Sequence, residues 1–218
     1  MAERKNSFAV IGLGAFGSTV AVELARLGAY VLGVDLDDRR VARVADQLAE
    51  AKILDATDET ALREAGFDRY GAVLVAIGES LEASILATLN ARLVGCRTVW
   101  VKARDKTHHR ILSRLGVDRV ILPEIEMGQH VAQMLHNPLV RDYASLGNGF
   151  FAMSLDVPAP LDGRRIASLD LARHGLRALA LMRGTKALDL ADDPVLARED
   201  HLVLLGRDSD LRRFGDAL

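Results

Sequence analysis

Short apolar runs alternate with amphipathic segments along the first half of the chain. The apolar runs, which are typical of buried parallel strands, cover residues 8–11, 30–34, 52–54, 72–77, 99–101 and 119–122. The segments that follow them carry apolar residues at helical spacing and cover residues 18–27, 38–50, 57–66, 78–93 and 107–115. This alternation predicts a doubly wound, Rossmann-like parallel α/β sheet with right-handed crossovers.

The pattern changes after Pro123. A helix is predicted from there to His136, and its apolar stripe makes it a candidate dimer or crossover helix at the end of a first domain over residues 1–136. We expect an irregular linker over residues 137–149. The pattern of residues 150–218 predicts a small α+β domain, with strands at 151–157, 176–182 and 202–205 and helices at 169–174 and 209–214. A module of about 70 residues is near the lower limit for independent stability, so we expect it to dimerise.

Three glycines mark the turn between the first strand and the first helix. Gly12 lets the chain turn sharply, Gly14 lets backbone approach a pyrophosphate, and Gly17 lets the helix pack closely on the sheet. The phosphates would lie on free N–H groups at the helix N-terminus. Asp35 ends the second strand, where its carboxylate can accept both hydroxyls of an adenosine ribose and would disfavour the 2′-phosphate of NADP. The alternatives are a glycine turn that serves only packing and an Asp35 that only caps a helix.

Composition narrows the class of protein. Among 218 residues, 28 are basic and 30 acidic, they are well mixed, and the net charge of −2 argues against a nucleic-acid partner. Cys96 is the only cysteine, which excludes a disulfide framework and fits a reducing cytoplasm. Because we find no apolar run close to the roughly 20 residues of a membrane span and no signal-peptide core, we expect a soluble, cytoplasmic protein that reaches a membrane only through a partner.

Candidate ligand-binding residues follow the predicted strands, because open α/β sheets bind ligands outside the carboxyl ends of their strands. They are Gly12 to Gly17, Asp35, Asp55, Ala56, Ile77, Gly78, Lys102, Arg104 and Glu124. Each has a simpler reading: Asp55 is an ordinary helix cap, the basic cluster from Lys102 to Arg110 is a solvated face, and Glu124 favours a helix dipole. One carboxylate also needs phosphate oxygens beside it to hold magnesium.

Several longer motifs carry a resemblance to a known family. They are FAVIGLGAFG at 8–17, VDLDDRRV at 34–41, DATDE at 55–59, LVAIGES at 74–80, WVKARDKTHHRIL at 100–112 and GVDRVILPEIEMG at 116–128, with a looser match at 169–184 and 199–206. The chain resembles the regulatory subunits of bacterial Ktr/Trk potassium-uptake systems, in which an RCK_N domain (regulator of conductance of K⁺) precedes an RCK_C domain. The resemblance covers nearly the whole chain.

The resemblance implies a nucleotide-controlled gating ring. Such proteins bind ATP, ADP or NAD(H) and assemble as homodimers and octameric rings beneath a membrane potassium-translocating subunit, which places them in the cytoplasm at the membrane periphery. Arg173 and His174 in the second domain are candidate contacts for a small anionic effector such as cyclic di-AMP.

The resemblance also implies roles for individual residues. Gly12, Gly14 and Ala15 would hold phosphates, Asp35 the ribose, Asp55 and Ala56 the adenine edge, and Ile77 and Gly78 the base and sugar face. Lys102, Arg104 and His108 would form the far rim, and Glu124 would coordinate a divalent cation such as Mg²⁺ beside the ATP γ-phosphate. Leu13, Phe16, Gly17, Leu36, Asp37 and Glu79 complete the implied cofactor-binding set. The family often has arginine in place of Ala15, so its absence favours NAD(H), ADP or AMP over ATP.

Two further functions compete with a regulatory binding module. A small NAD-dependent oxidoreductase would need an acid/base residue at the nicotinamide. Tyr30, Tyr70 and Tyr143 each lack the lysine four residues on that a Tyr-x-x-x-Lys pair requires, and about 70 residues is little for a substrate domain. The third hypothesis is a structural protein with a vestigial site. The sequence therefore favours a binding protein that is not an enzyme.

Overall fold

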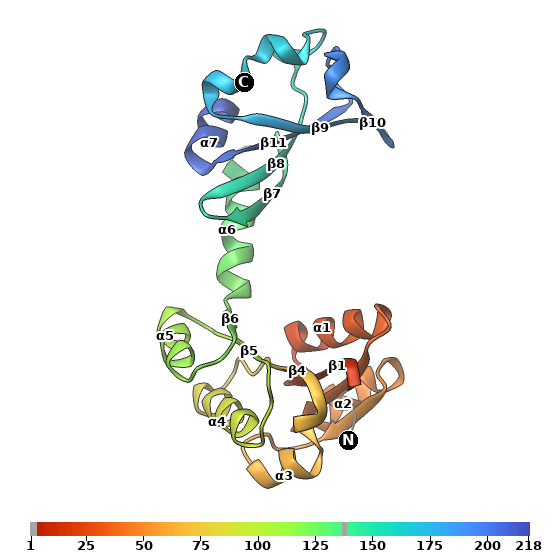
Figure 1. The fold of residues 1–218 in the computed structure, drawn as a ribbon, viewed down its shortest axis with the longest axis vertical. Helices are drawn as coiled ribbons and strands as arrows, with labels where there is room; N and C mark the ends of the chain where they lie inside the picture. The colour runs from red at the N-terminus through yellow and green to blue at the C-terminus, as the bar shows by residue number, and fades with distance from the viewer. Residues whose placement is uncertain (1–3, 137–138) are drawn as a thin grey trace. The chain divides into compact units, whose positions relative to one another are not determined.

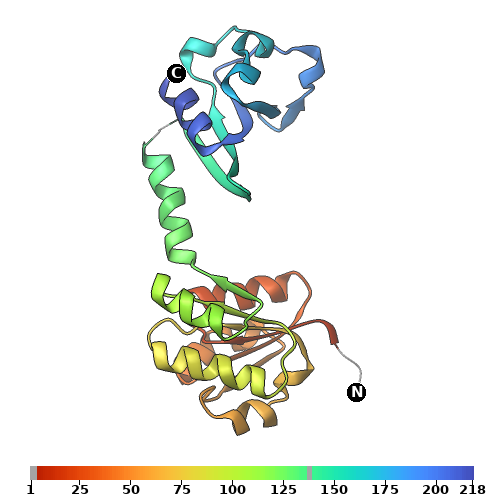
Figure 2. The ribbon, with the colours of Figure 1, turned by 60° about the vertical axis from the view of Figure 1, so that its left-hand side comes forward.

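The computed structural model describes residues 4–136 and 139–218, and it divides into two compact units, Met1–Ile125 and Glu126–Leu218. Figures 1 and 2 show the ribbon from two directions. Each unit has its own hydrophobic core and its own sheet.

The first unit is built on a six-stranded parallel sheet. Its strands are β1 (Arg4–Ile11), β2 (Tyr30–Asp35), β3 (Glu50–Ile53), β4 (Tyr70–Val75), β5 (Val99–Lys102) and β6 (Arg119–Ile121). They lie in the order β3-β2-β1-β4-β5-β6, and all neighbouring pairs are parallel. This is the Rossmann order, in which the chain reverses direction across the sheet between β1 and β4. The predicted fold class is confirmed.

Helices cover both faces of this sheet, as Figure 2 shows. They are α1 (Ala15–Arg26), α2 (Asp38–Val44), α3 (Glu59–Glu64), α4 (Leu81–Leu93) and α5 (Lys106–Arg114). Val10 of β1 packs in a cluster with residues of α1 and α2, whereas its neighbours Ala9 and Ile11 pack in a cluster with residues of α3, α4 and α5. Successive side chains of a strand point to opposite faces, so the buried strands separate two cores.

Two helix starts follow from side-chain caps. Asp58 caps α3 by accepting a hydrogen bond from the backbone N–H of Thr60. Asp37 caps α2 by accepting from the backbone N–H of Arg39 at 2.8 Å. Helix α2 also ends at Val44 and continues as a 3-10 turn, so the helix predicted over residues 38–50 is too long.

The second unit holds a five-stranded antiparallel sheet. Its strands are β7 (Val140–Gly147), β8 (Phe150–Asp156), β9 (Arg177–Arg183), β10 (Lys186–Leu188) and β11 (Asp200–Arg207), in the order β10-β9-β11-β8-β7. The closing helix α7 (Asp208–Asp216) packs its buried Leu211 and Phe214 into the same core as Leu181 and Leu202. Helix α6 (Pro123–His136) precedes the sheet, and its residues from Glu126 onward group with this unit.

The irregular linker predicted over residues 137–149 is wrong for its larger part. Residues 137 and 138 lie outside the described chain, but β7 occupies 140–147 and pairs with β8 as a hairpin. Asn148 and Gly149 form the two-residue turn, with φ of 53° and 77°. A type I′ hairpin turn requires positive φ at both central positions, which Asn and Gly tolerate. The segment predicted as a helix at 169–174 instead forms 3-10 turns, at Ile166–Leu169 and Leu171–His174.

Among the described residues, we find no helix that combines the length and the apolar character needed to cross a membrane.

Candidate functional site

A cavity of 620 Å³ opens at the carboxyl ends of the strands of the first unit. Its lining comes from the segments that follow β1, β2, β3, β4 and β5, together with the first turns of α1, α2 and α6. The lining residues are Ile11, Gly12, Gly14, Ala15, Phe16, Asp35, Leu36, Arg40, Leu54, Asp55, Ala56, Thr57, Ala76, Ile77, Gly78, Glu79, Ser80, Ala83, Lys102, Arg104 and Glu124. Its volume lies within the range of small-molecule sites.

The three glycines of the first turn have different surroundings. Gly12 has φ of +92°, and its N–H continues the sheet by donating to the carbonyl of Val34. A side chain at Gly17 would place its Cβ 1.9 Å from the carbonyl oxygen of Gly12, so this position fixes the packing of α1. A Cβ at Gly14 would meet nothing within 4 Å. Gly14 also begins α1 with no side-chain cap, which leaves the first N–H groups of the helix open to an anion in the cavity.

The carboxylate of Asp35 is held in one orientation. Its Oδ2 accepts a hydrogen bond from the N–H of Leu13 at 2.6 Å, and its Oδ1 accepts from the N–H of Asp37 at 2.9 Å. The residue is buried, with 9% of its surface exposed at the cavity. Each carboxylate oxygen keeps a second lone pair, so Asp35 can accept two further hydrogen bonds from a diol.

Arg40 stands beside Asp35 and was missed by sequence reasoning. Its Nη1 lies 3.7 Å from Asp35 Oδ2, its Nε lies 3.7 Å from Asp37 Oδ2, and its Nη2 donates to Glu79. The hydrogen bond to Glu79, together with the charges of Asp35 and Asp37, raises the pKa of Arg40 above its ordinary value. The one signal in the sequence was a basic residue in the first turn of the helix that follows Asp35.

At the other end of the cavity, a lysine and a glutamate form an ion pair. Lys102 Nζ lies 2.5 Å from Glu124 Oε1 and 5.6 Å from the centre of the Phe16 ring. Burial acts to raise the pKa of Glu124, but the hydrogen bond from Lys102, a backbone hydrogen bond and the charge of Lys102 together outweigh it and leave that pKa below its ordinary value. Arg104 lines the same end, so this part of the cavity can neutralise phosphate charge.

The loop after β3 is held rigidly against α4. Asp55 Oδ1 accepts from the N–H and the hydroxyl of Thr57 at 2.9 and 2.7 Å, which is the geometry of an Asx turn. Asn90 of α4 donates its side-chain amide to the carbonyls of Ala56 and Thr57 at 3.2 and 2.8 Å. This loop therefore forms a preorganised part of the cavity lining.

His108 has a different place from the rim position that the resemblance implied. Only 2% of its surface is exposed, and it is not among the residues that line the cavity. Its Nδ1 accepts a hydrogen bond from the backbone N–H of Arg104 at 3.2 Å, and the backbone N–H of His108 donates to Asp105 Oδ1 at 2.8 Å. Burial lowers the pKa of His108, which favours the neutral ring that can accept this bond. His108 therefore acts on the loop that carries Arg104.

The described residues do not form a metal site by themselves. No group of three histidine, cysteine, aspartate or glutamate side chains in this part of the chain is placed to hold an ion. Glu124 is a single carboxylate that is already paired with Lys102. A divalent cation would need oxygen ligands from a bound phosphate.

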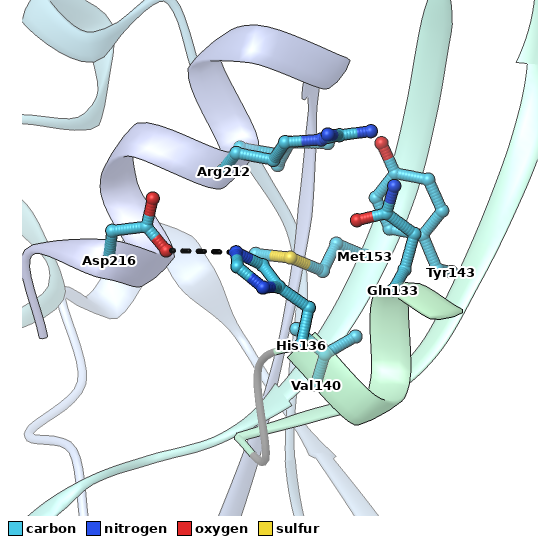
Figure 3. Close-up of a pocket in the computed structure, with 8 residues that line it drawn as sticks. Gln133, His136, Val140, Tyr143, Met153, Arg212 and Asp216 are labelled. Atoms are coloured by element: carbon cyan, nitrogen blue, oxygen red, sulfur yellow. Dashed lines mark ion pairs between the residues drawn. The ribbon is translucent and has the colours of Figure 1, made fainter. Parts of the chain in front are cut away.

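Another hollow lies in the second unit, between the end of α6, β7 and α7 (Figure 3). Its volume is 10 Å³, which is about the space of one water molecule. His136 Nε2 and Asp216 Oδ1 face each other across it at 4.0 Å. This hollow is too small for a nucleotide.

Comparison with known proteins identifies the family. The model of the TrkA-N domain matches residues 8–123, and that of the TrkA-C domain matches residues 150–218. The Ktr system potassium uptake protein A of Bacillus subtilis is 36% identical over 213 residues, which cover 97% of this chain and 96% of that protein. The chain belongs to the RCK family of TrkA-N and TrkA-C proteins. The resemblance that the motifs suggested is confirmed.

Solved RCK structures share the fold. The GsuK channel superposes with a TM-score of 0.68 at 14% identity, and the GsuK channel bound to NAD with 0.67 at 15%. Each match covers 97% of this RCK chain but only 39% of the solved chain. The likeness therefore concerns the fold of the two domains.

Fourteen of the eighteen predicted cofactor-binding residues line the cavity of this RCK protein, and Leu13, Gly17, Asp37 and His108 do not. Those four lie behind it: Leu13 and Gly17 in the packing of α1, Asp37 as the cap of α2, and His108 under the Arg104 loop. The lining residues that sequence reasoning missed are Ile11, Arg40, Leu54, Thr57, Ala76, Ser80 and Ala83. Most of them are apolar or small and carry no chemical signal of their own.

Proposed function

We propose that this protein is a cytoplasmic regulatory subunit of a potassium-uptake system, and that an adenine nucleotide binds in the cavity of its first unit. The full-length relationship to a Ktr potassium uptake protein supports the regulatory role. A solved channel of the same fold is bound to NAD, which supports a nucleotide ligand. ADP, NAD(H) and ATP are the candidates.

One observation carries the ligand assignment: the cavity joins an open helix N-terminus to an oriented carboxylate. Gly14 leaves room for a phosphate at the start of α1, and Asp35 presents free lone pairs to a ribose. The preformed wall from Asp55 to Thr57 then faces the base, and Lys102 and Arg104 face the outer phosphates. The parts of an adenine nucleotide match these chemistries in order.

Regulation requires that the ligand bind two conformations of the protein with different affinity, since equal affinity shifts no equilibrium. Glu124 lies in the first turn of α6, and Lys102 holds it while it also faces the cavity. A phosphate at this end would compete with Glu124 for Lys102. Glu124 also remains our candidate for a Mg²⁺ ion held jointly with phosphate oxygens.

The proposed assembly follows the family. We propose a homodimer that builds an octameric ring and docks beneath a membrane potassium-translocating subunit, with no nucleic-acid partner. Cyclic di-AMP at the second unit is a secondary proposal. There Arg173 pairs with Asp170 at 2.7 Å, and the ring of His174 meets Phe214 edge-on, so an effector would have to displace local contacts.

Calorimetric titration of the full chain with ADP and NAD⁺ tests the site. Asp35→Asn removes a charged acceptor, and hydrogen bonds to charged groups contribute about 1.5–3 kcal/mol each, so we expect affinity to fall by about tenfold to hundredfold or more. Asp38→Asn is the matched control. It makes the same change of charge three residues after Asp35, at a side chain that does not line the cavity. Equal affinity of wild type and Asp35→Asn, with both folded by thermal unfolding, would remove the assignment.

No observation favours the alternative of a small NAD-dependent oxidoreductase. The described lining residues include no tyrosine or histidine, and Lys102 and Glu124, which could serve as acid/base groups, are paired with each other. Incubation with nicotinamide cofactor and a panel of alcohols and ketones separates the two hypotheses. Turnover above the rate without protein would support the enzyme.

A further inference from the structure

The ribose end of the cavity contains two signals that usually point to different nucleotides. An aspartate at the end of the second strand is typical of a site for a free 2′-hydroxyl, whereas an arginine nearby is typical of a site for a 2′-phosphate. This chain has both, in Asp35 and Arg40. These two residue types alone therefore do not determine whether the ribose carries a free 2′-hydroxyl or a 2′-phosphate. The ion pairs of Arg40 distinguish the two possibilities.

Arg40 is already engaged with carboxylates in several directions. Its Nη1 and Nε lie 3.7 Å from oxygens of Asp35 and Asp37. Its Nη2 pairs with Glu79, which follows β4 and lines the cavity with Arg40. Arg40 and Glu79 are 39 residues apart in sequence, so this pair joins α2 to the loop after β4. The side chain of Arg40 is 30% exposed, and those of its partners are 8% (Asp35), 45% (Asp37) and 79% (Glu79) exposed, so only the side facing Asp35 is shielded from water.

The balance of charge at this end is negative, since one guanidinium faces three carboxylates. A phosphate monoester carries about −1.5 to −2 charges at pH 7. A 2′-phosphate placed beside Asp35 would therefore meet like charge, and the guanidinium that could offset it is held by Asp37 and Glu79. Like charges placed together in a binding site cost several kcal/mol.

We propose that Asp37 and Glu79 set the specificity of this site by holding Arg40 in their ion pairs, so that only nucleotides with a free 2′-hydroxyl bind. Asp37 and Glu79 are positioning residues in this account, because they act on the ligand through Arg40. The inference rests on the proposed nucleotide site. It explains why Arg40, although it lies near the ribose end, does not allow a 2′-phosphorylated cofactor to bind.

The double variant Asp37→Asn, Glu79→Gln tests this. Asn caps a helix as well as Asp does, so α2 keeps its start, and Gln keeps the size of Glu. The probes are AMP and adenosine 2′,5′-bisphosphate, which differ only by the 2′-phosphate. We expect the ratio of their dissociation constants to shift toward the bisphosphate by at least about tenfold, because a freed Arg40 can pair with phosphate.

Two controls separate Arg40 from a general change of charge. Asp38→Asn with Glu82→Gln makes the same total charge change in the first turns of α2 and α4, at acidic residues that do not line the cavity. We expect no shift in the ratio for this control. Adding Arg40→Ala to the first double variant should abolish the shift. A shift in the control, or a shift that survives Arg40→Ala, would overturn the proposal.

The same titrations distinguish failure of this inference from failure of the proposed function. If wild type binds AMP and the Asp37→Asn, Glu79→Gln variant does so with an unchanged ratio, the specificity proposal is wrong and the nucleotide site stands. If wild type binds neither AMP nor ADP, the nucleotide site is wrong, and the inference fails with it.

Discussion

At the scale of single residues, two glycines of the first turn should have different roles: Gly17 in the stability of the fold and Gly14 in binding of the ligand. Gly17→Ala would force a methyl group against the carbonyl of Gly12, and overpacking of this kind costs about 1–3 kcal/mol of unfolding free energy. Gly14→Ala adds a methyl group in open space, so the fold should tolerate it while ADP affinity falls because a phosphate loses its place. Thermal unfolding and ADP titration of both variants measure the contrast.

Gly128→Ala is the control for these substitutions. Gly128 lies in α6, outside the cavity, and a Cβ there meets nothing within 4 Å. A helix-interior alanine is more stable than glycine by about 0.5–1 kcal/mol, so this variant should gain stability and bind ADP normally. Equal loss of ADP affinity in Gly14→Ala and Gly128→Ala would contradict the role of Gly14.

The motif and the resemblance located most of the residues that line the cavity, but not their contacts. Asp35 could be placed because its chemistry follows from a fixed distance after a glycine turn. Arg40 could not, because its partner Glu79 is 39 residues away and only the sheet order brings them together. The resemblance implied that His108 lies at the rim of the site, but its side chain is buried. A match of sequence position does not determine the direction in which a side chain packs.

At the scale of elements, an ion pair between the exposed Arg183 and the buried Asp200 joins β9 to β11 in the second unit. Asp200 has no exposed surface and accepts from Arg183 Nε and Nη2 at 2.7 and 2.8 Å and from the N–H of Ala197 at 2.8 Å. Arg183→Met leaves this buried carboxylate without its charge partner, and because the guanidinium of Arg183 is itself 41% exposed, we expect a loss of about 1–3 kcal/mol of unfolding free energy. Arg177→Met, an exposed change in the same strand, should cost far less in urea unfolding.

The same pair gives the second unit a defined response to acid. The hydrogen bond from Arg183 is the main reason that the pKa of Asp200 lies below its ordinary value. A lowered folded pKa contributes stability that is complete above the unfolded value of about 3.9 and is lost as the pH falls toward the folded pKa. In Arg183→Met the dependence on acid below pH 5 should weaken. A wild-type slope in that variant would contradict this account.

The pattern of apolar positions located the parallel strands well and missed β7. The inner strands β1, β2 and β4 are largely buried on both faces, so most of their residues are apolar, whereas the edge strands β3 and β6 are partly exposed. In β7 the buried residues are Val140 and Tyr143, and a register shift after Val140 breaks the alternation of period two that would indicate a strand. Asn148 and Gly149 suit a hairpin turn, but without a recognised strand before them the hairpin could not be inferred.

At the scale of the whole molecule, the fold class followed from the alternation of strands and helices, and the family followed from the longer motifs. The order of the strands could not be predicted from the sequence, because no local pattern indicates that β4 lies beside β1. That neighbourhood brings the glycine turn, Asp35 and the loop after β4 to one edge, and thus creates the cavity. The two-unit architecture allows the site to be tested separately from the second unit.

Hydrogen exchange of the full chain with and without saturating ADP tests the central claim most directly. If an adenine nucleotide binds along the carboxyl edge of the first sheet, amides should gain protection in peptides that cover residues 12–18, 35–40, 55–58 and 77–80, all of which contribute to the cavity. We predict this protection in wild type and its loss in Asp35→Asn. Unchanged exchange at all four segments, or protection confined to Glu126–Leu218, would contradict the account.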